Sequence, residues 1–271
     1  MNRIAGSTRQ TCVMIENPVR DVSDAPRLGE LGRQFLAELR VLVVAGIPYG
    51  VVVAGIGGRL AMMLLRVTSP DGVSGVGTGV ESDDGFTIGE STLAGTYNLL
   101  LLGAAIGIIG VAAYRAVSPR VIGPMWFRRL TIGLGSGAVV GGMLIHDDGI
   151  DFHLLEPTWL AIGLFIALPF VFGAFIGPVV DRVADEASWT AHGHTKWILP
   201  LVLVAGFPLS LFTLFVATMI LLPWVLIRSV ALVGSIRAAR WFGLAIRAAW
   251  LAIALLGLSA LITDITQITS S

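Results

Sequence analysis

Residues 41–58 read VLVVAGIPYGVVVAGIGG, without a single charged side chain. Four further uncharged runs follow along the chain, at 91–114, 130–145, 158–180 and 197–227. A helix needs roughly 20 apolar residues to cross about 30 Å of hydrocarbon, and each run approaches or exceeds that length. The sequence therefore predicts an all-α fold, a polytopic helical membrane protein.

The overall composition supports this prediction. Hydrophobic residues make up 55% of the chain and charged residues 13%, against about 25% charged residues in soluble domains. The net charge of zero gives no general attraction for nucleic acid, so we expect none as a partner. The expected partners are the lipid bilayer and other membrane proteins. Cys12 is the sole cysteine, which excludes an intramolecular disulfide and a cysteine-based zinc site.

The placement of arginine predicts the orientation, because short cytoplasmic loops carry an excess of Lys and Arg. Arg33 and Arg40 precede the first run, and a basic segment at 115–129 follows the second. The loops at 68–90 and 146–156 carry acidic residues and no basic ones. We therefore predict a plasma (inner) membrane protein with a cytoplasmic N-terminal tail and two outward-facing acidic loops. The sequence leaves open whether translation starts at Met1 or Met14.

The run at 197–227 decides the number of helices. As one helix of about 31 residues it would be ~46 Å long, which is long for a single span. A hairpin of 197–215 and 217–235 keeps the following Arg237, Arg240 and Arg247 inside, and a last span then covers about 248–262. This gives about seven helices, and six with a kinked fifth is the alternative. The expected parts are a tail at 1–40, a four-helix unit at 41–180 and a C-terminal unit of two to three helices at 181–271.

Small residues recur at every fourth position in the first four predicted helices. Such small-xxx-small spacing lets helix backbones approach closely in a membrane. We expect these stripes to form a tightly packed four-helix unit. The later runs lack such stripes, and we expect a looser, lipid-facing unit there. The stripe residues are Gly46, Gly50, Ala54, Gly58, Gly103, Gly107, Gly133, Gly137, Gly141, Gly173 and Gly177.

Two short segments carry a resemblance to a known family. They are GGRLAM at 57–62 and SDDGFTIG at 82–89. Together they resemble a family of uncharacterised actinobacterial multi-pass membrane proteins, over roughly the first two helices and their loop. The resemblance implies a lineage and no particular activity.

Arg59 is the most informative single residue, because a charge within a membrane helix is costly unless it is paired or reaches the interface. It lies about seven residues, or ~10 Å along a helix, before Arg66. We expect a carboxylate from the outer loops to reach it, forming an ion pair or a polar pocket. The predicted group consists of Arg59, Asp83, Asp84 and Asn98.

A second cluster follows the third run, where imidazoles and carboxylates alternate over a short loop. These side chains suit zinc, manganese or iron, and the candidate ligands are His146, Asp148, Asp151 and His153. No established ligand spacing is present. The alternative is a solvated loop whose Asp-Gly pair makes a turn. We expect no cofactor otherwise, with a divalent metal at the acidic outer loops as the exception.

The sequence identifies no catalytic residue and leaves open whether the chain is an enzyme. Three functional hypotheses remain. The first is a non-enzymatic subunit or accessory protein of an envelope or membrane complex. The second is a transporter of a small solute or lipid, and the third is a metal-assisted enzyme at the outer leaflet.

Overall fold

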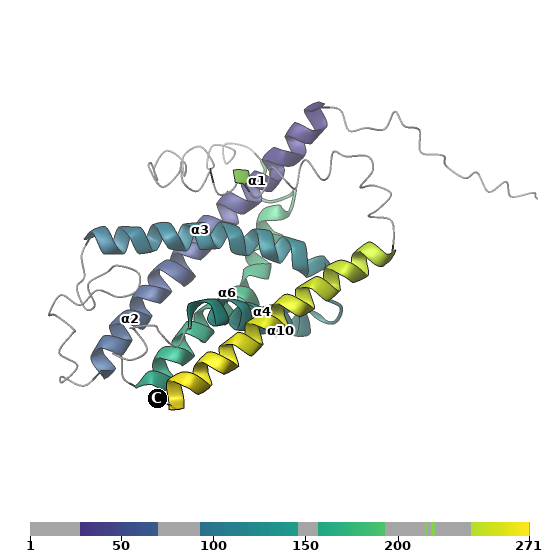
Figure 1. The fold of residues 1–271 in the computed structure, drawn as a ribbon. Coiled ribbons are helices and arrows are strands. Elements are labelled where there is room, and N and C mark those ends of the chain that lie inside the picture. The colour runs from purple at the N-terminus through teal and green to yellow at the C-terminus, as the bar shows by residue number, and fades with distance from the viewer. Residues whose placement is uncertain are drawn as a thin grey trace, which may run out of the picture.

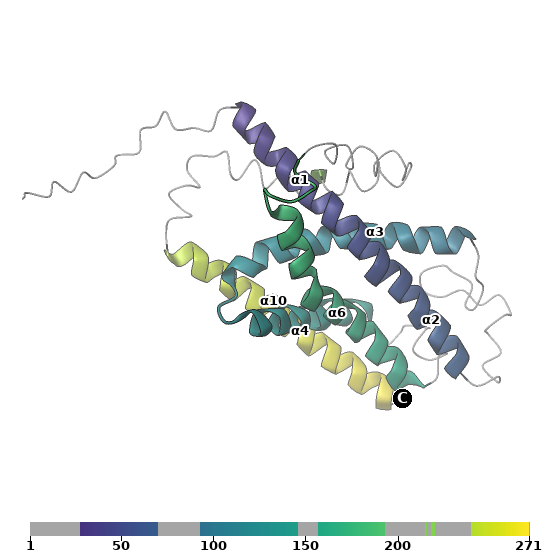
Figure 2. The ribbon, with the colours of Figure 1, turned by 180° about the vertical axis from the view of Figure 1, so that it is seen from behind.

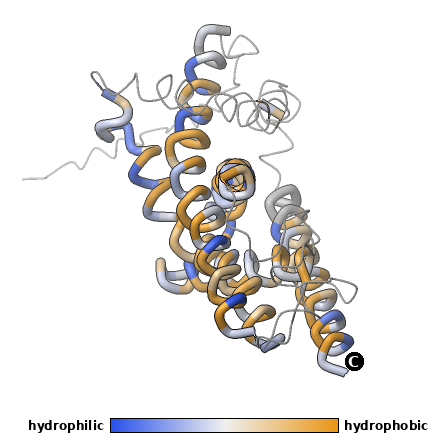
Figure 3. The backbone as a smooth tube through the Cα atoms, turned by 90° about the vertical axis from the view of Figure 1, so that its left-hand side faces the viewer, coloured by the Kyte–Doolittle hydropathy of each residue, from blue (hydrophilic) through white to orange (hydrophobic). Residues whose placement is uncertain are grey.

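A computed structural model describes residues 28–69, 93–145, 157–192 and 240–270, together with 215, 218 and 219. Every regular element in these residues is helical, and the long helices are apolar along most of their length (Figure 3). Four of them are long and apolar enough to cross a membrane: Gly32–Thr68, Leu93–Arg120, Thr158–Ala184 and Arg247–Ser270. The chain is a polytopic helical membrane protein, as predicted.

The first span is one continuous rod made of α1 (Leu28–Gly50), the π-helix η2 (Val51–Ile56) and α2 (Gly57–Thr68) (Figure 1). Its stretch Gly32–Thr68 contains 37 residues, or about 55 Å at 1.5 Å per residue. That exceeds the roughly 40–45 Å of a whole bilayer. The rod is therefore longer than the bilayer is thick, and its helix already begins at Leu28, before the charge-free run at 41–58.

Three more long helices follow. α3 covers Leu93–Val117 and ends in a 3-10 turn, η3, at Ser118–Arg120. Gly123, at φ +131°, is the one residue of the described segments with a positive φ, and Pro124 then caps α4 (Met125–Leu144). Glycine tolerates this φ without strain and proline suits a helix start, so the chain reverses here within a few residues. α6 covers Thr158–Ala184 and α10 covers Arg240–Ser270.

Helix contacts join α3 to α1, α1 to α6, α6 to α4 and α4 to α10, and α3, which crosses α1, also contacts α6 (Figures 1 and 2). One apolar core joins α1, α3 and α6 around residues such as Val43, Ile108 and Ile176. A second core, around Leu65 and Ile145, joins the ends of α2 and α4, the start of α6 and the last turns of α10. Thr68, Leu144, Thr158 and Ser270 thus lie toward one end of the bundle.

The glycine stripes of α3, α4 and α6 are buried, as predicted. The stripe of the first span differs from its predicted pattern. Gly46 and Gly50 contact α3, and Gly55 also contacts α3 and is buried, whereas the predicted Ala54 is only half-buried. A π-helix has i→i+5 hydrogen bonds and therefore more residues per turn, which moves the contact one position along. The fourth predicted member, Gly58, makes only an ordinary contact with Leu99.

The last helix also packs through a glycine, which the sequence analysis did not predict. The position of a Cβ on Gly257 of α10 lies 2.8 Å from the Cα of Val139 on α4. Further along both helices, Leu261 lies beside Gly141 and Gly142. The two helices therefore run parallel and touch backbone to backbone.

The direction of α10 bears on the number of helices. α4 is antiparallel to α6, because Gly133 lies at Ala174 and Gly141 at Ile166. Since α10 is parallel to α4, it begins at the end of the bundle where α6 finishes. A single crossing between them would bring the chain to the opposite end. This direction agrees with the predicted hairpin at 197–235, of which the structure describes only residues 215, 218 and 219.

Candidate functional site

Arg59 lies in the first turn of α2 and is half-buried, whereas Arg66 near the end of that helix is exposed. The distance from Val41 to Arg59 is about 27 Å along a helix at 1.5 Å per residue. With Val41 at one boundary of a hydrocarbon layer about 30 Å thick, Arg59 reaches the other boundary. Asn98 lies near the start of α3, is exposed, and its side chain forms no hydrogen bond within the described segments.

Most of the predicted ligands lie outside the described residues. These are Asp83 and Asp84 of the first acidic loop, and His146, Asp148, Asp151 and His153 of the second. The polar pocket around Arg59 and the metal site therefore both stay predictions. Within the described segments, no three His, Cys, Asp or Glu residues come together as metal ligands.

A polar contact crosses the middle of the bundle at Tyr49. This residue follows Pro48 and directly precedes the π-helix, so the α1 backbone is irregular here. Its hydroxyl donates to the carbonyl oxygens of Val171 at 3.4 Å and Phe172 at 3.3 Å, both on α6. The Tyr49 and Phe172 rings also meet edge to face, with centroids 5.0 Å apart. The contact joins α1 to α6 within the apolar core.

The arginine-bearing ends of the helices meet at one end of the bundle. Arg115 of α3 forms an ion pair with Glu38 of α1. Arg40 of α1 donates to the carbonyl of Val183, in the last turn of α6, at 3.4 Å. A cation at a helix C-terminus satisfies a free carbonyl and interacts favourably with the helix dipole. The predicted clustering of the basic segments on one side is therefore seen in the described helices.

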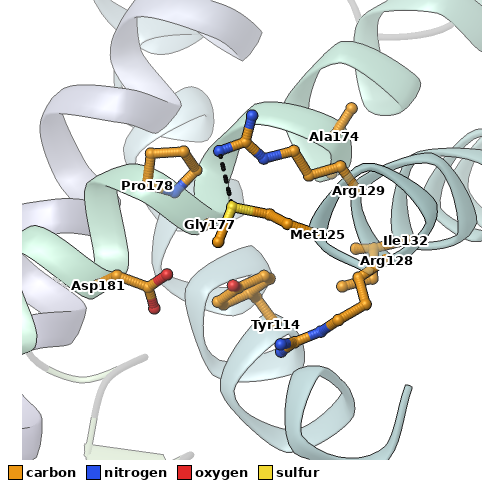
Figure 4. Close-up of a pocket in the computed structure, with 10 residues that line it drawn as sticks. Tyr114, Met125, Arg128, Arg129, Ile132, Ala174, Gly177, Pro178 and Asp181 are labelled. Carbon is orange, nitrogen blue, oxygen red and sulfur yellow. Dashed lines mark hydrogen bonds between the residues drawn. The ribbon is translucent and has the colours of Figure 1, made fainter. Parts of the chain in front are cut away.

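A cavity opens at this end between α3, α4 and α6 (Figure 4). Arg128 donates to both the carbonyl and the hydroxyl of Ser118, at 2.9 and 2.6 Å. Arg129 points to the sulfur of Met125, at 3.4 Å. The cavity has a volume of ≈ 40 Å³ and is lined by Tyr114, Met125, Arg128, Arg129, Ile132, Gly173, Ala174, Gly177, Pro178 and Asp181. It combines two cations, one carboxylate and a phenol.

The sequence analysis did not single out Tyr114 or Asp181. A usable signal was present, since Asp181 is an acidic residue at the predicted basic side of the membrane. What brings the residues together is the packing of α6 on α3. A Cβ on Gly177 would lie 2.7 Å from the hydroxyl oxygen of Tyr114, so the small residue makes room for the phenol.

Comparison with curated proteins gives a match to a transport protein. The chain is similar to the Na(+)/H(+) antiporter NhaA of Rhizobium meliloti (strain 1021), with 29% identity over 185 residues. The match covers 64% of this chain and 41% of that protein, so the chain spans about two fifths of the length of this relative. No family model and no solved structure matches the chain. The relative agrees with a membrane location.

Proposed function

We propose that the chain is a non-enzymatic subunit or accessory protein of a membrane complex, in the plasma membrane with its N-terminus in the cytoplasm. The proposal rests on the close contacts between helices, in which a glycine of one helix lies against backbone atoms of the next. Gly50 meets Gly107, Gly173 meets the Ile132 carbonyl, and Gly257 meets Val139. Contacts of this kind leave no path for a substrate between α1 and α3 or between α4 and α10. They favour a rigid scaffold.

The orientation within the proposal rests on charge. The contacts of Arg40, Arg115 and Arg128 place the basic segments at one end of the described bundle. Because cytoplasmic loops carry the excess of Lys and Arg, this end faces the cytoplasm, and the tail at 1–40 lies on the same side.

The proposal is tested by the size of the assembly in native membranes. The tagged full chain, expressed from its own locus, is extracted in a mild detergent and its mass is measured by light scattering. We expect a defined complex larger than the chain and its detergent, whose other subunits are the same in repeated preparations. A lone chain in every mild detergent, with cross-linking in intact membranes also giving no adduct, would contradict the proposal.

A second candidate function is favoured by the comparison with the antiporter. In this case the chain transports a small solute or lipid, and Arg59 and Asn98 are the polar groups that contribute to binding, with Arg59 suited to an anionic group. The chain is reconstituted in proteoliposomes with an inside-acid pH gradient, and sodium is added outside. Sodium-dependent loss of the gradient would support transport and contradict a purely structural role. An unchanged gradient supports the first proposal.

A further inference from the structure

The cavity between α3, α4 and α6 is bordered by charges that lack ionic partners. Within the part of the chain that the structure describes, neither Arg128 nor Arg129 forms an ion pair, and the Asp181 carboxylate accepts no hydrogen bond. Arg128 uses one of its nitrogens on Ser118, which leaves further N–H donors of the guanidinium unused. The cavity therefore offers both cationic and anionic side chains to a ligand.

The surroundings place this cavity at the depth of lipid headgroups. Trp126 and Phe127, in the first turn of α4, meet edge to face with ring centroids 5.8 Å apart, and the Trp126 side chain is 66% exposed. Exposed aromatic residues at a helix end are typical of the membrane–water interface. Deeper along the helices the lining becomes apolar, at Ile132 and Ala174. Met125 and Ile132 are seven residues apart, or about 10 Å on a helix.

The lining of the cavity is charged at its opening and apolar toward the membrane interior. A phospholipid has the same order, with a polar headgroup followed by an apolar part. The cavity volume of ≈ 40 Å³ is space for about three waters, at roughly 15 Å³ of probe volume for each, so the cavity holds the phosphate group while the acyl chains lie outside it. Arginine presents a planar fork of N–H donors that matches phosphate oxygens. The carboxylate of Asp181, on the opposite side of the opening in Figure 4, can accept hydrogen bonds from an ammonium group.

We propose that this cavity binds the headgroup of an amine-bearing phospholipid, with Arg128 and Arg129 on the phosphate and Asp181 on the ammonium. Phosphatidylethanolamine carries both groups. Phosphatidylglycerol lacks the ammonium and leaves Asp181 beside an anion. Phosphatidylcholine has a quaternary ammonium without N–H donors. The carboxylate therefore selects among phospholipids, and the arginines supply affinity for all of them.

Native mass spectrometry of the full chain in detergent tests the proposal, with the three lipids carrying identical acyl chains. We expect phosphatidylethanolamine to bind about tenfold more tightly than either other lipid, a difference of roughly 1.4 kcal/mol. Arg129→Gln weakens binding of all three lipids. Asp181→Asn removes the preference for phosphatidylethanolamine without weakening phosphatidylglycerol. Arg182→Gln, a change at the exposed neighbour of Asp181 that does not line the cavity, leaves binding as it is.

Thermal unfolding of each variant shows that it is folded before its lipid binding is compared. Equal retention of the three lipids, or equal losses in Arg129→Gln and Arg182→Gln, overturns the proposal. Soluble phosphoethanolamine is then tested as a competitor of the bound lipid. Displacement of the lipid only at concentrations far above that of the lipid supports a membrane ligand, whereas equal affinity would assign the cavity to a soluble phosphate ester and overturn it.

Discussion

Gly107 of α3 lies so close to Gly50 of α1 that its Cα stands 2.6 Å from the position that a Cβ on Gly50 would occupy. Real Cβ atoms do not approach backbone atoms this closely, so neither helix can carry a larger residue here without moving. The neighbouring pair Gly46 and Gly107 shows the same relationship. Lipid gives no hydrophobic driving force between helices, and close backbone packing of this kind replaces it.

Gly50→Ala is therefore expected to destabilise the protein by about 1–3 kcal/mol, the usual cost of overpacking a core. Gly163→Ala is the matched control, because a Cβ there has no atom within 4 Å. Alanine is a better helix former than glycine by about 1 kcal/mol, so the control should be neutral or slightly stabilising. Thermal unfolding in detergent measures both. Equal melting temperatures for the two variants would show that the packing of α1 on α3 does not depend on Gly50.

Gly257→Leu is expected to be more damaging than Gly137→Leu. A Cβ on Gly257 would stand 2.8 Å from the Val139 backbone, whereas a Cβ on Gly137 would have its nearest neighbour, the Ile166 carbonyl, at 3.4 Å. The first change must push α10 away from α4, and the second adds bulk where ordinary contact is still possible. The melting temperatures of the two variants in the same detergent decide the order, and a milder effect at Gly257 would contradict the observed packing.

Tyr49→Phe removes the hydroxyl that donates to α6 but keeps the ring that packs against Phe172. A typical intramolecular hydrogen bond contributes about 1 kcal/mol. We expect a loss of that size in the free energy of unfolding, measured by denaturant titration in mixed micelles. Tyr97→Phe, at an exposed tyrosine, should leave stability unchanged. A loss in both variants would mean that the effect is not due to the contact with α6.

Arg59→Ala should destabilise the protein more than Arg66→Ala, because Arg59 is half-buried and Arg66 is exposed. Loss of a hydrogen bond to a charged group costs about 1.5–3 kcal/mol, and we expect the difference between the two variants to lie in this range. Thermal unfolding measures it. A larger effect at Arg66 would mean that Arg59 already extends into the headgroup layer.

The orientation is tested by cysteine labelling on intact cells in a Cys12→Ser background. A cysteine at Asp84 should react with an impermeant maleimide and one at Ile122 should not. Ile122 suits this test because its side chain is 72% exposed, whereas the nearby Ser118 is buried against Arg128. Labelling at Ile122 but not at Asp84 would reverse the proposed orientation.

The sequence by itself determined the membrane class, the approximate positions of the described helices and most of their packing faces, although α10 (Arg240–Ser270) is longer at both ends than the predicted span at 248–262. Charge-free runs and glycine spacing were sufficient to predict these features, because each feature is a property of a single helix in lipid. The glycine stripes of α3, α4 and α6 were found at their predicted positions.

Only the tertiary structure decided which of these faces meet and where the exceptions lie. The π-helix brings Gly55 to α3 five residues after Gly50. A four-residue pattern could not predict this, because a change in the number of residues per turn is not visible in it. Gly257 faces α4, although no glycine lies four residues before or after it to mark a stripe. The meeting of Tyr114, Arg129 and Asp181 at one cavity depends on the packing of three helices, and spacing along a single chain does not specify it.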